Sequence, residues 1–267
     1  MLVLHRLVVG LFLMISAIAQ AQSFTSIQVT SARSADVQSR RVRVFPNGDL
    51  SATSVNAITL ISYGYDVPAN PSERLSALPP WVYSERYDIE ARASSTTKHL
   101  APSDENRSEL VRAIFRQVLA DRFHFVIRTE NRSIPVYALV VAPSGAELKP
   151  VSDTECIFDT ARDGCHTFPG GFGHPLNANA VDMDDLAHYI ENWTDLPVVN
   201  RTSLTGVFMM SSEGWRPMRL PPPPPNGERV DFTQLKTIDA VLGGLGLQLQ
   251  KGFATVPIYT VDQIQRP

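Results

Sequence analysis

Two cysteines and two histidines stand close together in the second half of the chain, and they are the densest group of residues that could do chemistry. They are Cys156, Cys165, His166 and His174. In a chain that leaves the cytosol, an even and closely spaced cysteine pair predicts a disulfide. The alternative is a metal site built from all four residues, but their spacing matches no standard zinc pattern. A redox role would need a tighter pair such as C-x-x-C.

Three carboxylates follow this group at Asp182, Asp184 and Asp185. Paired carboxylates can work as general acid and base, but only when they face each other across a cleft at a set distance. Here the start of a predicted helix explains them, since Asp182 can cap that helix with Asp185 in the third position. His188 lies on the same helix near Asp184, where we expect a solvated surface pair.

Other catalytic motifs are missing from the sequence. There is no G-x-S-x-G, no H-E-x-x-H and no phosphate-binding glycine loop ahead of a helix. The sequence therefore predicts no catalytic residue, no bound metal and no cofactor. Only His166, His174 and the Asp182 group support the weaker hypothesis of an unrecognised hydrolase.

The tryptophans offer a candidate ligand surface. Trp81, Trp193 and Trp215, together with His166 and His174, are the residues that we expect to contact a ligand if one binds. The alternative for Trp193 is the apolar core face of a helix, and Trp81 would cover a sheet.

The helices and strands that must position these residues are predicted to form an internal repeat, with the same order of elements in both halves of the chain. Leu50–Ile61 aligns with Leu176–Ala187, and Pro135–Tyr137 aligns with Pro257–Tyr259. Each copy reads strand, helix, strand, helix, strand, strand, and Pro46-Asn47-Gly48 makes a hairpin turn in the first. The predicted fold is α+β, with two tandem copies whose helices pack on mixed or antiparallel sheets. The first copy covers residues 22–150 and the second covers 151–267.

The start of the chain has the layout of a secretory signal peptide. A charged tip with Arg6 precedes the apolar run Leu7–Ala19, and small-x-small sites follow. We expect cleavage after about residue 21, no membrane span after cleavage and a periplasmic or secreted location. The net charge of −3 comes without a basic stripe, which disfavours a nucleic-acid partner.

Three short pieces carry a family resemblance: LADRF, PVYALVV and RTSLTG. With them the chain resembles an uncharacterised family of exported proteins from soil bacteria, called soil-associated or acidobacterial-type. That family carries a domain of unknown function that is also attached to sensor-type membrane metallopeptidases. The resemblance spans Phe24 to Pro267 and departs at Val207–Met210, where the family has a Tyr-Asp-Phe strand. It implies export and a duplicated domain, and it supplies no catalytic residues.

A more remote similarity is to the short periplasmic domains that begin secretins and TonB-dependent receptors, which is an analogy of fold alone. The leading functional hypothesis is a non-enzymatic envelope module that binds a protein or peptide partner, by strand addition at an open sheet edge. The alternative is a sensory or small-ligand-binding domain that uses the cleft between the two copies.

Overall fold

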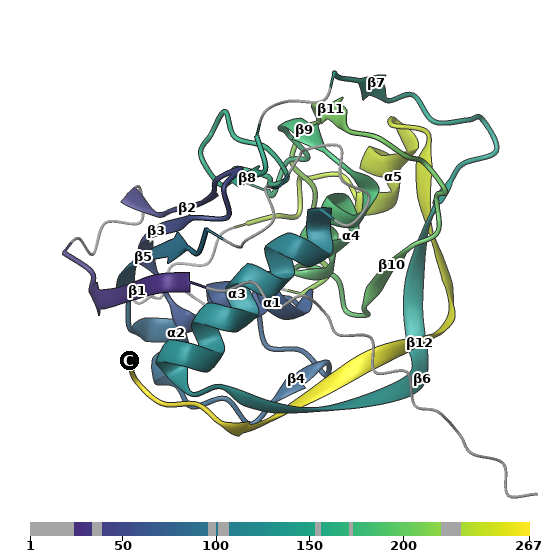
Figure 1. The fold of residues 1–267 in the computed structure, drawn as a ribbon. Coiled ribbons are helices and arrows are strands. Elements are labelled where there is room, and N and C mark those ends of the chain that lie inside the picture. Colours follow the sequence, from purple (N-terminus) through teal and green to yellow (C-terminus); the bar gives the residue numbers. More distant parts are fainter. Residues whose placement is uncertain are drawn as a thin grey trace, which may run out of the picture.

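The computed structural model describes residues 24–33, 39–95, 100, 107–152, 156–170, 173–219 and 231–267. The predicted signal segment, residues 1–21, lies outside them. In the described part the chain is α+β, as predicted, with helices packed against three sheets (Figure 1). The helices are α1 (Ala57–Tyr65), α2 (Trp81–Ser84), α3 (Arg107–Phe123), α4 (Met183–Glu191) and α5 (Ile238–Gly243).

A five-stranded sheet forms most of the first half. Its strands, in spatial order, are β1 (Phe24–Ser31), β5 (Tyr87–Ala93), β3 (Leu50–Val55), β2 (Arg41–Val44) and β8 (Phe158–Asp159). The turn between β2 and β3 contains Gly48 at φ 85°, a conformation that favours glycine, so the predicted hairpin is confirmed. Helices α1 and α3 pack together beside the sheet and bury Leu60, Ile61 and Phe115.

A smaller sheet and two helices form the second half. Its strands are β7 (Lys149–Pro150), β11 (Phe208–Met210) and β9 (Ala178–Val181). Helices α4 and α5 contribute Leu186, Ile190 and Leu242 to a second core. The order β3, α1, β5, α3 in one half matches β9, α4, β11, α5 in the other when three short elements are set aside, and they are β4 (Leu75–Ser76), α2 and β10 (Val198–Asn200). A long strand ends each half, β6 (Val126–Val141) in the first and β12 (Leu247–Gln263) in the second. That this order reflects a duplication stays a prediction.

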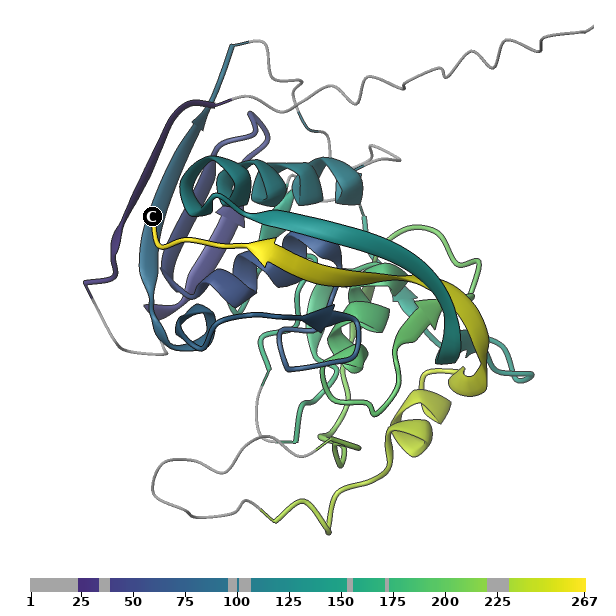
Figure 2. The ribbon, with the colours of Figure 1, turned by 90° about the horizontal axis from the view of Figure 1, so that it is seen from below.

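Two long strands, β6 (Val126–Val141) and β12 (Leu247–Gln263), run antiparallel along almost their whole length (Figure 2). The prediction of two short strands at the end of each half was therefore wrong. Polar segments that look like turns stay extended because each has an unbroken partner, as where Gly252 faces Val136. Phe123 is the last residue of α3, and its side chain is buried in the first core.

The two halves exchange strands across the predicted boundary at residue 150. Strand β4 (Leu75–Ser76) pairs parallel with β12, and β10 (Val198–Asn200) pairs parallel with β6. The end of β12 places Val261 in the first core, whereas the end of β6 places Leu139 in the second. The start of β12 therefore packs in the second core and its end in the first, while the end of β6 packs in the second.

Within the described residues, no helix is long and apolar enough to cross a membrane.

Candidate functional site

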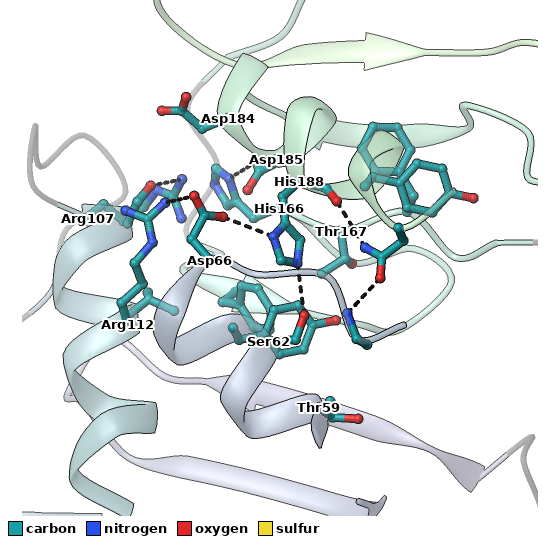
Figure 3. A pocket seen from close by; sticks show the side chains of 18 of the residues that line it. Thr59, Ser62, Asp66, Arg107, Arg112, His166, Thr167, Asp184, Asp185 and His188 are labelled. Carbon is teal, nitrogen blue, oxygen red and sulfur yellow. Dashed lines mark hydrogen bonds and ion pairs between the residues drawn. The ribbon is translucent and has the colours of Figure 1, made fainter. Parts of the chain in front are cut away.

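A cavity of about 330 Å³ lies where the two halves meet (Figure 3). Helices α1 and α3 line it from the first half, and α4 and the loop before it line it from the second. Its wall carries rings from both sides, and they are Tyr63, Phe158, Phe168, Tyr189 and Trp193. Pockets of this size with apolar walls and a few polar groups are the usual form of small-molecule sites.

His188 joins the halves at the centre of this cavity. Its Nδ1 lies 3.0 Å from a carboxylate oxygen of Asp66, and its Nε2 lies 3.2 Å from the hydroxyl of Ser62 (Figure 3). The expectation of a solvated surface pair with Asp184 was therefore wrong, because α4 turns His188 toward the carboxyl end of α1. Sequence analysis also missed Asp66 and Ser62, which no local motif marks.

The order serine, histidine, aspartate has the connectivity of a hydrolase triad, but Ser62 is not placed as a nucleophile. Ser62 lies within α1 and is only 3% exposed, and its hydroxyl donates to the Val67 carbonyl at 2.7 Å. With its proton donated to the Val67 carbonyl, the Ser62 hydroxyl does not donate to His188 in the way that a nucleophilic serine donates to its general base.

Charge from α4 and α3 fixes the ionisation of Asp66. Burial would raise the pKa of Asp66, but the hydrogen bond and charge of His188, with Arg112 at 3.5 Å, hold that pKa well below its usual range. Asp66 is therefore ionised where it contacts the His188 ring between the two halves.

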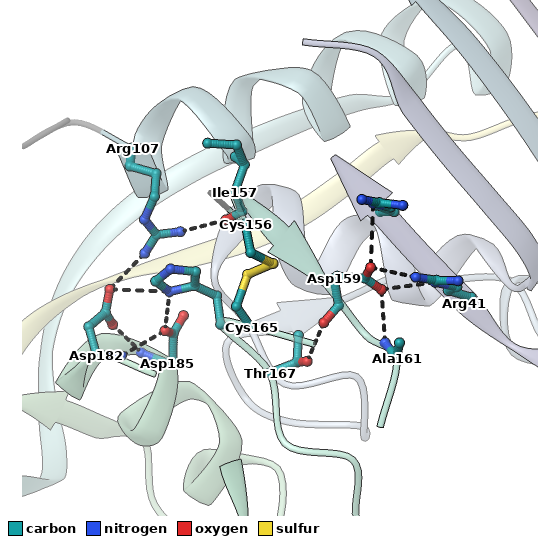
Figure 4. The surroundings of a disulfide bond; sticks show 12 residues. Arg41, Arg107, Cys156, Ile157, Asp159, Ala161, Cys165, Thr167, Asp182 and Asp185 are labelled. Atoms are coloured by element: carbon teal, nitrogen blue, oxygen red, sulfur yellow. Dashed lines mark hydrogen bonds and ion pairs between the residues drawn. A yellow bond between two sulfur atoms is a disulfide. The ribbon is translucent and has the colours of Figure 1, made fainter. Parts of the chain in front are cut away.

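A second polar cluster forms the floor beside the first turn of α4 (Figure 4). Asp182 and Asp185 make the predicted capping box, which is confirmed. The Nδ1 of His166 lies 2.7 Å from Asp185, and Arg107 donates to Asp182 at 2.7 Å. One histidine and two carboxylates could hold a metal ion. The guanidinium of Arg107 and the backbone donors of the helix already satisfy these oxygens, however, so the cluster fits a structural role.

The pKa values of the two carboxylates in this cluster are shifted in opposite directions. Burial and then the neighbouring charge of Asp185 raise the pKa of Asp182 to about 6. Burial also disfavours the charged form of Asp185, but the hydrogen bond and charge of His166 lower its pKa below the ordinary value. Asp185 is therefore the partner that holds His166 in place.

The predicted disulfide between Cys156 and Cys165 is confirmed. Since the two cysteines bond to each other, they cannot serve the metal site considered as the alternative. The bridge closes the loop that delivers His166 to the floor of the cavity (Figure 4).

The residues of the predicted ligand surface fall into three positions. His166 and Trp193 line the cavity. His174 stacks on Trp193 with 3.6 Å between ring centroids, and Trp215 is fully buried with its ring edge-on to His174 at 6.4 Å. These two rings therefore support the wall from behind. Trp81 lies elsewhere, stacked on Phe123 under the guanidinium of Arg266.

Several polar atoms in this aromatic wall have no hydrogen-bond partner among the described residues. They are His174 Nε2, Tyr189 Oη, Trp193 Nε1 and Trp215 Nε1. Buried donors and acceptors of this kind are rare in folded proteins. This wall therefore carries hydrogen-bonding atoms that no group in the described residues satisfies.

Two charges at the cavity lack ion pairs. Arg40 and Asp184 both line the cavity and are exposed. Within the described residues, no carboxylate lies within ion-pair distance of Arg40 and no cation within that distance of Asp184, whose Oδ1 accepts only from Asn200. The other arginines and aspartates that line the cavity are paired, and they are Asp66, Arg107, Arg112 and Asp185.

Residues 58–264 match the family described as "Protein of unknown function (DUF3738)". The chain belongs to this family. The match runs from α1 almost to the end of β12, so the DUF3738 region supplies lining residues from both halves of the cavity. No curated protein and no solved structure matches the chain. The predicted resemblance to a domain of unknown function is thus confirmed, while the soil-bacterial origin and the secretin-like analogy stay predictions.

Removal of the disulfide will destabilise this DUF3738 chain. We expect the double variant Cys156→Ser, Cys165→Ser to lose about 2–3 kcal/mol of unfolding free energy, because a short closed loop restricts the unfolded chain. Urea titration followed by tryptophan fluorescence measures it. Reducing agent should shift the wild-type curve by the same amount and leave the variant unchanged; an equal effect of reductant on both would contradict the assignment.

Acid will weaken the DUF3738 fold through His174. Burial lowers the pKa of His174 from 6.5 to about 4. Between these values the unfolded chain binds a proton that the folded chain does not, so stability falls as the pH drops from 6.5 to 4. We expect His174 to contribute about 2 kcal/mol to this loss, since its ring keeps some contact with solvent.

The measurement is urea unfolding at pH 7 and at pH 4.5 for the wild type and His174→Asn. Asparagine tolerates the left-handed backbone at this position, where φ is 54°. The variant should be less stable at pH 7 but should lose less stability on acidification. A parallel loss in both proteins would show that His174 does not titrate in this way.

Proposed function

We propose that this chain is a non-enzymatic binding protein of the cell envelope that holds an amino acid, or the end of a short peptide, in the cavity between its halves. The observation that carries the proposal is the pair of unmatched charges, Arg40 and Asp184, on a cavity with aromatic walls. A zwitterion offers one carboxylate and one ammonium group to match them. An apolar side chain would contact rings such as Tyr63 and Trp193.

The charge balance of the cavity favours this ligand class over a simple anion or cation. A simple anion would leave Asp184 unmatched, and a simple cation would leave Arg40 unmatched. Because both side chains are exposed, each contact would contribute on the order of 1 kcal/mol. Selectivity would therefore come from the two charges acting together.

The disulfide fits an extracellular or periplasmic protein, since such bonds persist in oxidising compartments. An envelope protein meets free amino acids and peptide fragments of other proteins, which suits the proposed ligand. We propose export by the signal segment at residues 1–21 as part of the same function.

Thermal unfolding and calorimetry of residues 22–267 test the proposal. Phenylalanine and the dipeptide Phe-Phe should stabilise the fold by about 2.7 kcal/mol at a concentration one hundred times the Kd. N-acetylated or C-amidated phenylalanine, which lacks one charge, should bind about tenfold more weakly.

Matched variants locate the site. Arg40→Gln and Asp184→Asn should each weaken binding about tenfold. Arg132→Gln is the control, since Arg132 is an exposed arginine on β6 outside the cavity. If the capped analogues bind as well as free phenylalanine, or if the cavity variants bind like the control, the proposal is wrong.

A further inference from the structure

Arg40 also lines a second hollow beside the first. This groove, about 1020 Å³ in volume, runs between the start of β2, the loop after β8 and the sheet that contains β9 and β11. Its lining includes Arg40, Arg41 and Arg162 and, among the described residues, no carboxylate. The groove and the cavity therefore share one arginine at their junction.

The groove keeps positive charge after its own ion pairs are counted. Arg41 binds both oxygens of Asp159, at 3.0 and 2.7 Å, and Arg43 lies 3.5 Å from the same carboxylate. Arg40 and Arg162 have no carboxylate within ion-pair distance in the described part of the chain, and both are exposed. Since the whole chain carries a net charge of −3, this surface opposes the overall charge.

The remaining lining groups suit an extended chain. Asn179 on β9, the terminal strand of its sheet, offers an amide donor and acceptor, and Asn177 just before β9 adds an amide donor, since its Oδ1 already accepts from the Ser212 N–H. Exposed Met209 on β11 adds an apolar contact. Arginines that flank such a surface can bind carboxylates with two parallel hydrogen bonds.

We infer that the groove binds the acidic side chains of an extended peptide whose amino-terminal residue occupies the cavity. This inference rests on the proposed function and names its ligand more closely. The terminal ammonium group pairs with Asp184, and the first side chain contacts the aromatic wall. The peptide backbone then leaves the cavity along the groove, and the following acidic residues reach the unpaired Arg40 and Arg162.

The test uses fluorescence anisotropy with two peptides that carry a dye at the carboxyl end. Each begins with phenylalanine and continues with four glutamates or four glutamines. The glutamate peptide should bind about tenfold more tightly, and added salt should remove the difference. Acetylation of its terminal amine should weaken it about tenfold, because the ammonium group loses Asp184.

Arg162→Gln is the critical variant. It should weaken the glutamate peptide about fivefold and leave the glutamine peptide unchanged, whereas Arg132→Gln makes the same change in net charge and should affect neither. Equal binding of both peptides, with Asp184→Asn weakening both, would overturn the groove inference and leave the proposed function standing.

Two further outcomes count against the inference in different ways. An acetylated glutamate peptide that binds as tightly as the free one would show that the groove binds polyanions independently of the cavity. Failure of both peptides and of phenylalanine to bind would overturn the groove inference and the proposed function together.

Discussion

Arg74→Ala will lower the unfolding free energy by about 3–5 kcal/mol, because it leaves the carboxylate of Glu191 buried without a partner. Arg74 donates to both oxygens of Glu191 at 2.9 Å, and the two side chains are only 7% and 5% exposed. Arg74 belongs to the first half and Glu191 ends α4, so the pair joins the two halves. Urea titration at pH 7 measures the loss.

The pH dependence identifies the mechanism of this loss. Burial raises the pKa of Glu191, and Arg74 opposes that rise. In Arg74→Ala the folded pKa will rise further above the unfolded value, so the folded state binds more protons and stability falls as the pH increases above that value. The variant should therefore be closer to wild type at pH 5 than at pH 8.

A double variant supplies the control. Arg74→Met with Glu191→Leu removes both charges and keeps apolar volume, so it should be much more stable than Arg74→Ala alone. If the double variant loses the sum of the two single losses, the pair is not coupled and the explanation fails.

Truncation after Val256 will abolish cooperative folding. The deleted residues 257–267 pair with the start of β6 and with β4, and they place Ile258 and Val261 in buried positions. Burial of two such side chains alone contributes about 3–6 kcal/mol. Together with the lost strand pairing, this is comparable with the whole stability of a domain. Circular dichroism and thermal unfolding of the truncated chain measure it.

A shorter deletion tests whether any truncation of the carboxyl terminus destabilises the fold, or only one that removes the end of β12. Removal of Arg266 and Pro267 breaks the ion pair between Arg266 and Glu85, whose side chains are 61% and 38% exposed, and the contact of the Arg266 guanidinium with the Trp81 ring. Because exposed ion pairs contribute little to stability, the unfolding temperature of this shorter variant should stay close to that of the wild type. Cooperative unfolding of the longer truncation near the wild-type temperature would show that the end of β12 is dispensable.

Local signals in the sequence predicted the parts of the fold that depend on near neighbours. Asp182 and Asp185 indicate the start of α4, because a capping box is formed by two residues three positions apart in the sequence. The turn at Asn47 and Gly48 and the bond between Cys156 and Cys165 likewise depend on short segments of chain. The α+β class followed from such elements.

Contacts between distant segments could not be predicted in this way. The cavity exists because α4 meets α1, which brings His188 to Asp66, and neither residue has a neighbour in sequence that marks the contact. The pairing of β6 with β12 is equally remote, and it overrides turn-like residues such as Asn131 and Gly252. Hence the sequence identified His166 and Trp193 as site residues, missed Arg40 and Asp66, and wrongly assigned His188 to a solvated surface.

The exchange of long strands also sets an order of events during synthesis. Val261 completes the first core from near the carboxyl end, so a nascent chain still held by the ribosome lacks a piece of the structure that its earliest elements require. Such remote pairing slows folding. On the export route that we propose for this chain, this delay would keep the leading part of the chain unfolded until passage is complete.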